Sequence, residues 1–582
     1  MLSCLSVRVH ASGLVVSDID TSDLLPSQIR GGKNGIPATM FTMKDVDNLQ
    51  FVKLDVLGLR TLDVLAYWKN DMKIQHGLDI TWSGLDRQEH PDEMWSMINN
   101  GFTAGIFQVE DGYGRQLCKR MKPKSIMDLA VIGALNRPGP IQAGIPDDYI
   151  ARLNGEQAVT YPHPKFKELM EKHLKSTFGL WVFQEQIINY FNELGYTLSE
   201  SDAIRKIMGK KKPEQMDAVR DGLEEWTDRG YLKMAERAGI PLEVAQSIWE
   251  DIEGFADYCF NLAHSVEYGV ITFRTVFAKY YGTSEFYAAV IRSLVPSPEE
   301  EADKKKSADT DKRKKLLPLI IQECRRLGIE VHPPDIENSQ GFTYSKEGAI
   351  YFGFSEIKGV RASGPYIVQL RDEMGLDISS FDNFVSAFDK YNEKWNLDKK
   401  FAIKNGEGGS YAGVRSPKQS LGANKITALD LIGCWNNVTG IKHSLSKQQE
   451  IEEELLSCVL TDNSLEILEA NLERIHECDS YEDALTPWVE KAIDPDDPNG
   501  YLDYKLPGVI TNIDEKIAKR SGEPFGIIQI TYDEHELEFI TFAKTWKRIK
   551  PNFKIRTPGI FEVRQGPDTQ WVHLMRLKTL LN

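Results

Sequence analysis

The spacing of apolar residues changes along this chain, and the change excludes a fold built around one core. From about residue 88 to 295 the apolar residues recur at the helical period, as in FKELMEKHLKSTFG and QEQIINYFNELG. From Leu506 onward they alternate with polar residues, as in PFGIIQITYDEHELEFITFA, which is typical of short strands. Because one hydrophobic core rarely serves a chain of 582 residues, we expect roughly three to five domains.

The charge of the chain limits what it binds. Its formal net charge is −16 at pH 7, and a uniformly acidic surface repels phosphate. Basic residues nevertheless cluster in CKRMKPK, IRKIMGKKKP and DKRKK, each of which is either a local phosphate site or a solvated face. The third cluster lies in a stretch that alternates Glu, Asp, Lys and Ser, so we interpret residues 296–315 as an exposed charged linker.

Two classes of protein are disfavoured by the sequence. It has no run of about 18 apolar residues and no basic segment followed by an apolar one at its start, so we expect no membrane partner and a cytoplasmic location. The seven cysteines are scattered and never follow the C-x-x-C spacing. This pattern argues against a disulfide framework or a zinc site.

A single carboxylate stands out in the stretch FVKLDVLGLRTLDV. Asp55 follows Lys53 by two residues inside a mostly apolar run, where an unpaired charge is costly to bury. This run and HASGLVVSDI favour strands of a sheet, and RTLDVLAYWKNDMK favours a following helix. Asp55 is therefore a residue whose role needs an explanation.

Two further clusters carry chemistry. Basic residues at the end of an expected helix and in the turn after it are numerous enough to hold a triphosphate: Arg205, Lys206, Lys210, Lys211 and Lys212. Downstream, His264 lies at the start of an apolar helical pattern, in FNLAHSVEYG. A lone histidine in such a place is more often structural, and that reading stays open.

The second half of the chain contains a candidate phosphate-binding turn. LLPLIIQECRRLGIEVHPPDI predicts a helix, a glycine stop and a short strand. A strand, a turn at residues 357–360 and a helix after Ser363 follow, which suits a helix-hairpin-helix turn with Lys358 and Gly359 near a phosphate. A plain loop before a helix is the alternative. The last strands suit a small barrel of the oligonucleotide-binding kind or a sandwich.

Nine segments together resemble one family, the bacterial replicative DNA polymerase III alpha subunits or C-family polymerases, and they occur in the family's order. They are VHASGLVVS, FVKLDVLGLRTLDVL, GIFQVEDGYGRQLCKRMKP, ALNRPGPIQAG, STFGLWVFQEQIINYF, LSESDAIRKIMGKKKPEQM, DYCFNLAHSVEYGVITFRT, CRRLGIEVHPPDI and YFGFSEIKGV. The resemblance covers the central and C-terminal part of an alpha subunit.

The resemblance implies a multidomain α+β fold. Its expected parts are the C-terminal half of a palm with a mixed sheet (1–88), large mainly helical fingers (89–295), the charged linker (296–315), a helix-hairpin-helix and clamp-region domain (316–435), a connecting helical segment (436–504) and an OB-like β-barrel (505–582).

The resemblance also implies a role for Asp55. In this family three palm aspartates hold two Mg²⁺ ions, which activate the primer 3′ hydroxyl and steady the leaving pyrophosphate. Asp55 matches the third aspartate, and Lys53 matches a lysine of the same motif. The other two belong to a P-D-x-D-x-D-F motif upstream of Val9, which we expect on an N-terminal polymerase portion. Asp18 and Asp20 have D-x-D spacing, but they stand where the family places no metal ligand, and we interpret them as a turn.

In the fingers, the resemblance implies contacts to the incoming nucleotide or the primer-template from Arg137, Arg205, Lys206, Lys210, Lys211 and His264. Three positions depart from the family. Asn136 replaces an aromatic residue, Lys206 a second arginine, and Leu262 with Ala263 a Lys-Ser pair. No clamp-binding motif is matched in the stretch 436–454, which leaves the contact with a sliding clamp open.

The sequence therefore predicts part of a DNA-directed DNA polymerase, a nucleotidyltransferase that binds primer-template and deoxynucleoside triphosphates. We expect it to be inactive without the portion that carries the other aspartates, and to work in a bacterial cytoplasm or nucleoid or as a virus-encoded protein. The rival interpretation is a non-catalytic DNA-binding or replisome scaffold derived from the same family. Retention of KLDVLGLRT and RKIMGKKK favours the enzyme, since a scaffold needs no magnesium ligand.

Overall fold

The computed structural model divides the chain into two compact units, Met1–Ile80 and Thr81–Asn582, which are considered separately below. The structure describes residues 13–17, 24–30, 36–56, 58–209, 213–223, 226–255, 259–295, 307–404, 415–439, 445–460, 502–517, 522–532, 535–541, 546–547, 558–565 and 572–579.

The described residues of the first unit form two small sheets and two helices. Strands β1 (Gly13–Val16) and β4 (Val52–Asp55) pair antiparallel, as do β2 (Ser27–Arg30) and β3 (Ile36–Thr39). Helix α1 (Met43–Asn48) precedes β4, and α2 (Arg60–His76) follows it. The strands and the helix expected around Asp55 are confirmed. The mixed sheet expected for residues 1–88 is not present among the described residues, because each strand pair there is antiparallel and two-stranded.

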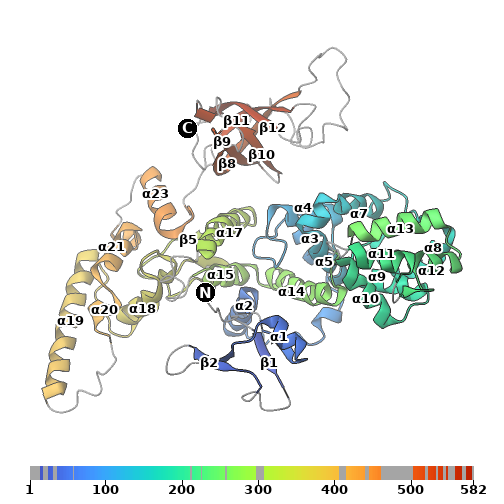
Figure 1. The fold of residues 1–582 in the computed structure, drawn as a ribbon. Coiled ribbons are helices and arrows are strands. Elements are labelled where there is room, and N and C mark those ends of the chain that lie inside the picture. The colour runs from blue at the N-terminus through green and yellow to red at the C-terminus, as the bar shows by residue number, and fades with distance from the viewer. Residues whose placement is uncertain are drawn as a thin grey trace. The chain divides into compact units, whose positions relative to one another are not determined.

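The described part of residues 81–295 is helical, with no strand beyond one isolated bridge (Figure 1). Its helices are α3 (Asp92–Asn99), α4 (Gly112–Met121), α5 (Ile126–Leu135), α6 (Pro138–Gln142), α7 (Ile145–Leu153), α8 (Pro164–Leu174), α9 (Gln184–Glu193), α10 (Leu198–Gly209), α11 (Pro213–Asp221), α12 (Tyr231–Arg237), α13 (Leu242–Phe255), α14 (Leu262–Tyr281) and α15 (Thr283–Ser293).

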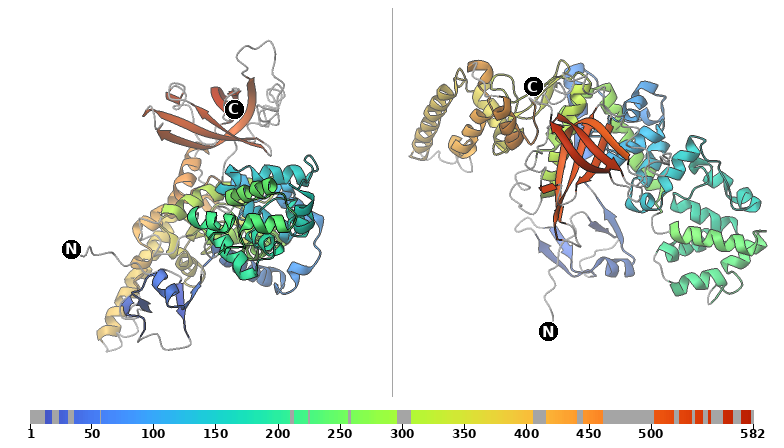
Figure 2. Two further views of the ribbon diagram at one scale, coloured as in Figure 1. Left: turned by 45° about the vertical axis from the view of Figure 1, so that its right-hand side comes forward. Right: turned by 90° about the horizontal axis from the view of Figure 1, so that it is seen from above.

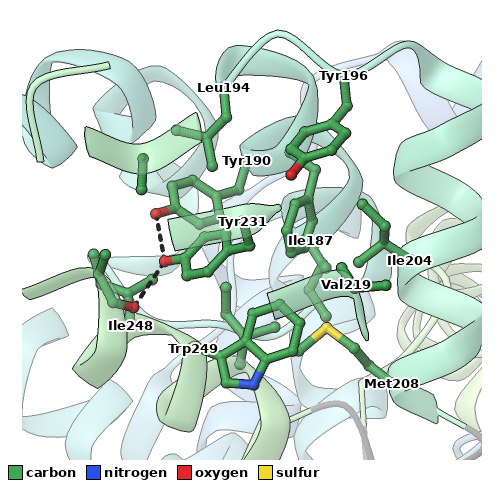
Figure 3. Close-up of a cluster of buried hydrophobic side chains, with 14 of the residues drawn as sticks. Ile187, Tyr190, Leu194, Tyr196, Ile204, Met208, Val219, Tyr231, Ile248 and Trp249 are labelled. Atoms are coloured by element: carbon green, nitrogen blue, oxygen red, sulfur yellow. Dashed lines mark hydrogen bonds between the residues drawn. The ribbon is translucent and has the colours of Figure 1, made fainter. Parts of the chain in front are cut away.

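An aromatic core holds helices α8 to α13 together (Figure 3). The hydroxyl groups of Tyr190 and Tyr231 lie 3.0 Å apart, and the Tyr231 hydroxyl donates to the Ala245 carbonyl at 2.9 Å. Burial raises the pKa of both phenols, which therefore stay neutral donors. Ile204 and Met208 pack into the same core from α10. The basic residues of α10 are consequently left on its outer side.

A buried ion pair joins four segments of the second unit. Lys279 of α14 is fully buried and donates to the carbonyls of Phe102 and Ala104 and, at 2.6 Å, to Glu323 Oε2. The Glu323 carboxylate also accepts from the Tyr287 hydroxyl at 2.6 Å and from the Ala104 amide at 2.9 Å. Every one of these polar groups has a partner, which offsets the cost of removing both charges from water.

Glu323 belongs to α17 (Ser307–Arg326), and this helix corrects the interpretation of residues 296–315. The expected exposed linker is wrong from Ser307 onward, because the chain there is helical and Arg313 is only 2% exposed. The Arg313 guanidinium donates to the carbonyls of Leu294, Glu356 and Leu456. A charge in an alternating charged run is thus buried by backbone acceptors that are distant in sequence.

The region after α17 is mixed. The predicted helix, glycine stop and strand are confirmed, since Gly328 adopts φ +68° between α17 and β5 (Val331–His332). Strands β5, β7 (Ala349–Tyr351) and β6 (Tyr344–Lys346) form a mixed sheet in that order. The helices that follow are α18 (Gly364–Asp372), α19 (Phe381–Lys404), α20 (Pro417–Ser420), α21 (Ala423–Leu431), α22 (Asn436–Thr439) and α23 (Leu445–Leu456).

The last strands close into a five-stranded barrel, not a sandwich (Figure 2). They are β8 (Leu502–Ile517), β9 (Pro524–Tyr532), β10 (His535–Thr541), β11 (Pro558–Gln565) and β12 (Val572–Thr579). The order around the barrel is β8-β9-β10-β12-β11, and β11 pairs back to β8; only β10 and β12 run parallel. Most of the expected connecting segment, residues 461–501, lies outside the described residues.

Among the helices in the described residues, none combines the length and the apolar composition needed to cross a membrane.

Replacing Lys279 by methionine tests the buried ion pair. Glu323 then stays buried without its cation, and we expect the free energy of unfolding to fall by about 3–5 kcal/mol. The urea midpoint, followed by tryptophan fluorescence, measures the change. Lys233→Met, which removes an exposed pair with Asp228, is the matched control and should cost less than about 1 kcal/mol. Equal effects of the two changes would contradict the central role of the pair.

Candidate functional site

The candidate site lies where the start of α14 meets the start of α9. Phe260 and Phe183 form an isolated parallel bridge, in which the Gln184 amide donates to the Phe260 carbonyl at 2.8 Å. The Phe260 amide donates in turn to the Val182 carbonyl at 3.4 Å. This bridge fixes the backbone just before α14, and with it the direction in which Phe260 presents its ring.

Arg137 stacks on that ring. Its guanidinium carbon lies 3.4 Å from the centroid of Phe260, and its Nε donates to the Gly133 carbonyl at 3.3 Å. Arg137 precedes Pro138, the first residue of α6, so it stands in the turn between α5 and α6, and its side chain reaches back to that carbonyl of α5. Burial lowers the pKa of Arg137, although the group stays a cation at neutral pH. The Phe260 face partly replaces the water that Arg137 loses.

His264 lies next in the same row of rings. Its ring centroid is 5.3 Å from that of Phe260 and 4.2 Å from that of Tyr268, one helical turn further along α14. Tyr268 then contacts Phe107 at 5.3 Å. We call Phe260, His264, Tyr268 and Phe107 the aromatic row. Each is half-buried, so the row presents ring surface to solvent while its other side packs on the helices.

Glu185 occupies the N-terminus of α14. Its carboxylate accepts from the Leu262 amide at 2.8 Å and from Asn261 Nδ2 at 2.9 Å, and Asn261 Oδ1 accepts from the His264 amide at 2.8 Å. A negative charge is favourable here because the free amides and the helix dipole are positive. Sequence reasoning missed Glu185, and no local signal indicates that it reaches a helix that starts 77 residues later.

The basic cluster of α10 is paired with an acid of its own helix. Asp202 Oδ1 accepts from Arg205 Nε at 3.0 Å and Nη2 at 2.9 Å, and Asp202 Oδ2 accepts from Lys206 Nζ at 2.6 Å. The hydrogen bond from Lys206, and then that from Arg205, hold the pKa of Asp202 below its usual value. Sequence reasoning also missed Asp202, although its i+3 and i+4 spacing to the two cations was a readable signal.

Arg205 acts electrostatically on Cys259, the residue before Phe260: burial raises the pKa of the Cys259 thiol to about 11, and the Arg205 charge opposes this shift. The structure brings Arg137 and His264, predicted from two separate segments, into contact with the same ring of Phe260. Lys210 and Lys211 lie outside the described residues.

The expected phosphate-binding turn is a separate feature. Lys358 and Gly359 are exposed between two short 3₁₀ helices, Phe354–Glu356 and Arg361–Ser363, and α18 begins after Ser363 as predicted. Gly359 has φ +87°, a conformation that favours glycine. The Lys358 amide donates to the Leu455 carbonyl at 2.8 Å, so this donor is already used within the chain.

The expected metal site is only partly represented. Asp55 ends β4 opposite Gly13, but its side chain lies outside the described residues, as do Asp18 and Asp20. Lys53, in the same strand, is half-buried. No group of three His, Cys, Asp or Glu side chains able to hold a metal occurs among the described residues. One carboxylate is too few for two divalent cations, so these residues alone do not fit a two-metal site.

Comparisons with known proteins give a consistent family. Residues 61–229 match the model of the bacterial DNA polymerase III alpha subunit finger domain, and residues 5–58 match that of the bacterial DNA polymerase III alpha NTPase domain. These matches support the family resemblance of the sequence: the chain is similar to bacterial DNA polymerase III alpha subunits over most of its length. The finger match begins within α2 and includes Arg137, Arg205 and Lys206, whereas His264 follows its end.

Relatives in the family are much longer than this chain. The alpha subunit of Aquifex aeolicus (strain VF5) is 29% identical over 551 residues, which is 93% of this chain and 43% of that protein. A Helicobacter pylori alpha subunit is 29% identical over 98% of this chain and 46% of its own length. The alpha subunit of Escherichia coli (strain K12) is 34% identical over 64% of this chain and 30% of its own length. The chain thus spans less than half of these relatives.

Replacing Glu185 by alanine tests the cap of α14. The amide of Leu262 and Asn261 Nδ2 lose their acceptor, and we expect the first turn of α14 to lose about 1–2 kcal/mol of stability. Hydrogen exchange of the peptide covering residues 259–268 should become faster. Glu185→Gln keeps one carbonyl acceptor and should show a smaller change. Unchanged exchange in the alanine variant would remove Glu185 from the cap.

Proposed function

We propose that this chain supplies the fingers and DNA-binding modules of a replicative DNA polymerase, which extends a primer by template-directed nucleotidyl transfer. The observation that carries the proposal is that Arg137 and His264 contact the ring of Phe260, while the charge of Arg205 acts on the adjacent Cys259. The family resemblance selects Arg137, Arg205 and His264 from three separate segments as contacts to the nucleotide or primer-template. Their grouping at one place supports a common ligand.

The chemistry of the site suits a nucleoside triphosphate beside nucleic acid. Arg137 and Arg205 offer guanidinium donors, which bind phosphate oxygens in a fork and neutralise charge during transfer. Lys206 would add a point charge from α10, and Lys210 and Lys211, which follow this helix in the sequence, would add two more. The exposed edge of the aromatic row provides ring faces beside these cations, and such faces stack on bases.

Catalysis would need further carboxylates. In the complete site we propose that Asp55 is one of three aspartates that hold two Mg²⁺ ions, with Lys53 beside them. The other two aspartates would come from the polymerase segment that carries the P-D-x-D-x-D-F motif, on the same or on another polypeptide. The ions would supply the charge that activates the primer hydroxyl and steadies the leaving group.

Two C-terminal features support contacts to DNA. The strand order of the barrel, with the third and fifth strands parallel and the fourth strand pairing back to the first, favours an oligonucleotide-binding barrel. We propose that this barrel binds single-stranded DNA, and that the exposed turn at Lys358 and Gly359 approaches the duplex backbone. Binding at both places would depend on phosphate contacts and so weaken with salt.

Primer extension tests the proposed function. The purified chain should bind primer-template without extending it, and should extend it when mixed with an alpha-subunit segment that carries the P-D-x-D-x-D-F motif. Asp55→Asn should abolish extension by the mixture and leave DNA affinity intact. Extension by the chain alone would overturn the proposed division of the metal ligands. DNA binding with no extension in the mixture would favour the scaffold interpretation.

The ion pairs of Asp202 with Arg205 and Lys206 allow a test in which the KM for nucleotide should rise in one variant and fall in another. Arg205→Ala with Lys206→Ala should raise the KM for nucleotide in the mixture by about tenfold, which corresponds to about 1.4 kcal/mol of lost binding. Asp202→Asn removes the acid with which phosphate must compete, and it should lower the KM. Asp217→Asn, on the neighbouring helix, is the control and should change neither value. Opposite signs for the first two variants are the decisive result, and equal signs would contradict a phosphate role.

A further inference from the structure

A pocket lies among helices α7, α8 and α13, which are labelled at the right of Figure 1. Its volume is about 430 Å³, within the range of small-molecule sites. Its lining includes no residue of the aromatic row and none of the cations discussed above. We call it the tip pocket. Residues of α7, α8 and α13 line it, together with the segments 160–162 and 179–181.

Aromatic rings form the walls of the tip pocket. The ring centroids of Tyr161 and Phe166 are 6.4 Å apart, and those of Phe166 and Trp181 are 6.1 Å apart. Trp181 stacks on Phe255 at 6.3 Å with an interplanar angle of 29°. The planes of these neighbouring rings meet at 44°, 71° and 29° in turn, and an aromatic lining of this kind favours a flat, unsaturated ligand over a branched aliphatic one.

One side of the tip pocket carries an unused donor. Arg152 Nη1 donates to the Phe178 carbonyl at 2.9 Å, whereas the buried Arg152 Nε has no hydrogen-bond partner in the described structure. A Cβ on Gly179 would lie 3.3 Å from Arg152 Nη1 and 3.6 Å from the Thr160 carbonyl. The glycine therefore leaves space in the pocket beside Arg152 and Thr160. With Nη1 engaged, the Nε and Nη2 edge of the guanidinium is left as a two-donor fork. An unmet buried donor is costly, and a ligand that accepts from it recovers that cost.

A carboxylate also lines the tip pocket. Asp251 of α13 is an exposed residue, like its neighbour Glu250, and makes no hydrogen bond or ion pair to any described residue; partial desolvation of its carboxyl group raises its pKa. The lining of the tip pocket therefore includes a cation with an unused Nε donor and an acid without a partner among the described residues, together with aromatic walls. Its ligand must offer hydrogen-bond acceptors to Arg152 and hydrogen-bond donors to Asp251.

We propose that the tip pocket binds a guanine base. Guanine carries two adjacent acceptors, O6 and N7, which match an arginine fork, and its N1 and N2 donors match a carboxylate. Its faces match the ring walls. Adenine fits less well, because its N1 is an acceptor and would face the Asp251 carboxylate. The base belongs either to a free guanine nucleoside or nucleotide or to an unpaired nucleotide of a strand, and the proposal does not depend on the polymerase role.

Binding of guanosine to the full chain, measured by isothermal titration calorimetry, tests the proposal. Guanosine should bind about tenfold more tightly than adenosine, since the mismatch leaves the polar groups of the tip pocket unpaired. Inosine, which lacks the N2 amino group, should lie between them. Asp251→Asn should weaken guanosine binding by about tenfold, and the exposed neighbour Glu250→Gln should not change it. Arg152→Gln should weaken binding as well, with circular dichroism to verify its fold.

Two results would overturn the proposal: equal affinity for guanosine and adenosine, or guanosine binding that survives Asp251→Asn unchanged. A competition arm distinguishes the sources of the base. If a single-stranded TTGTT oligonucleotide displaces guanosine and TTATT does not, the guanine belongs to a strand. If neither displaces it, the ligand is the free nucleoside or nucleotide. Because the readout is nucleoside affinity, a failure of primer extension leaves this test unaffected.

Discussion

Lys279 carries a charge without access to water, and the helical region is arranged so that this charge is satisfied. Burial lowers the pKa of Lys279, and the nearby Glu323 carboxylate opposes that shift. The pair connects α14 with α17 and with the segment at residues 102–104, so α14 cannot slide along its axis without breaking a buried ion pair. Because α14 carries His264 and Tyr268 at its other end, the pair at Lys279 also fixes where the aromatic row stands.

The candidate site, which we propose to bind phosphate, already contains two carboxylates. Glu185 occupies the amides at the start of α14, and Asp202 holds Arg205 and Lys206. Both carboxylates stabilise the arrangement of positive groups in the absence of a ligand. A phosphate group that binds Arg205 and Lys206 has to compete with Asp202, which reduces affinity but favours ligands with more than one negative charge. Selectivity for polyphosphates is thus consistent with this pairing.

Local sequence patterns predicted those helices and strands whose ends are set by neighbouring residues. The end of α17 at Gly328, the helix after Ser363 and the strand at Val52–Asp55 all follow from spacing and from turn residues. Arg313 was misread because an alternating charged run looks solvated, whereas its acceptors include Leu456, 143 residues away. The carboxylate of Glu185 was missed for the same reason. Burial and pairing across such separations depend on tertiary packing, which no local period encodes.

The closed barrel has a consequence for the behaviour of the C-terminal region. Its strand β8 pairs with β9 along one side and with β11 along the other, with a register shift between Ile510 and Asn512 where the strand bends. Closure gives each of the five strands a neighbour on both sides, although β10 and β12 pair at only two positions. A sheet closed in this way offers less free edge to the strands of a second molecule than an open sheet does, so this region is less exposed to edge-to-edge association.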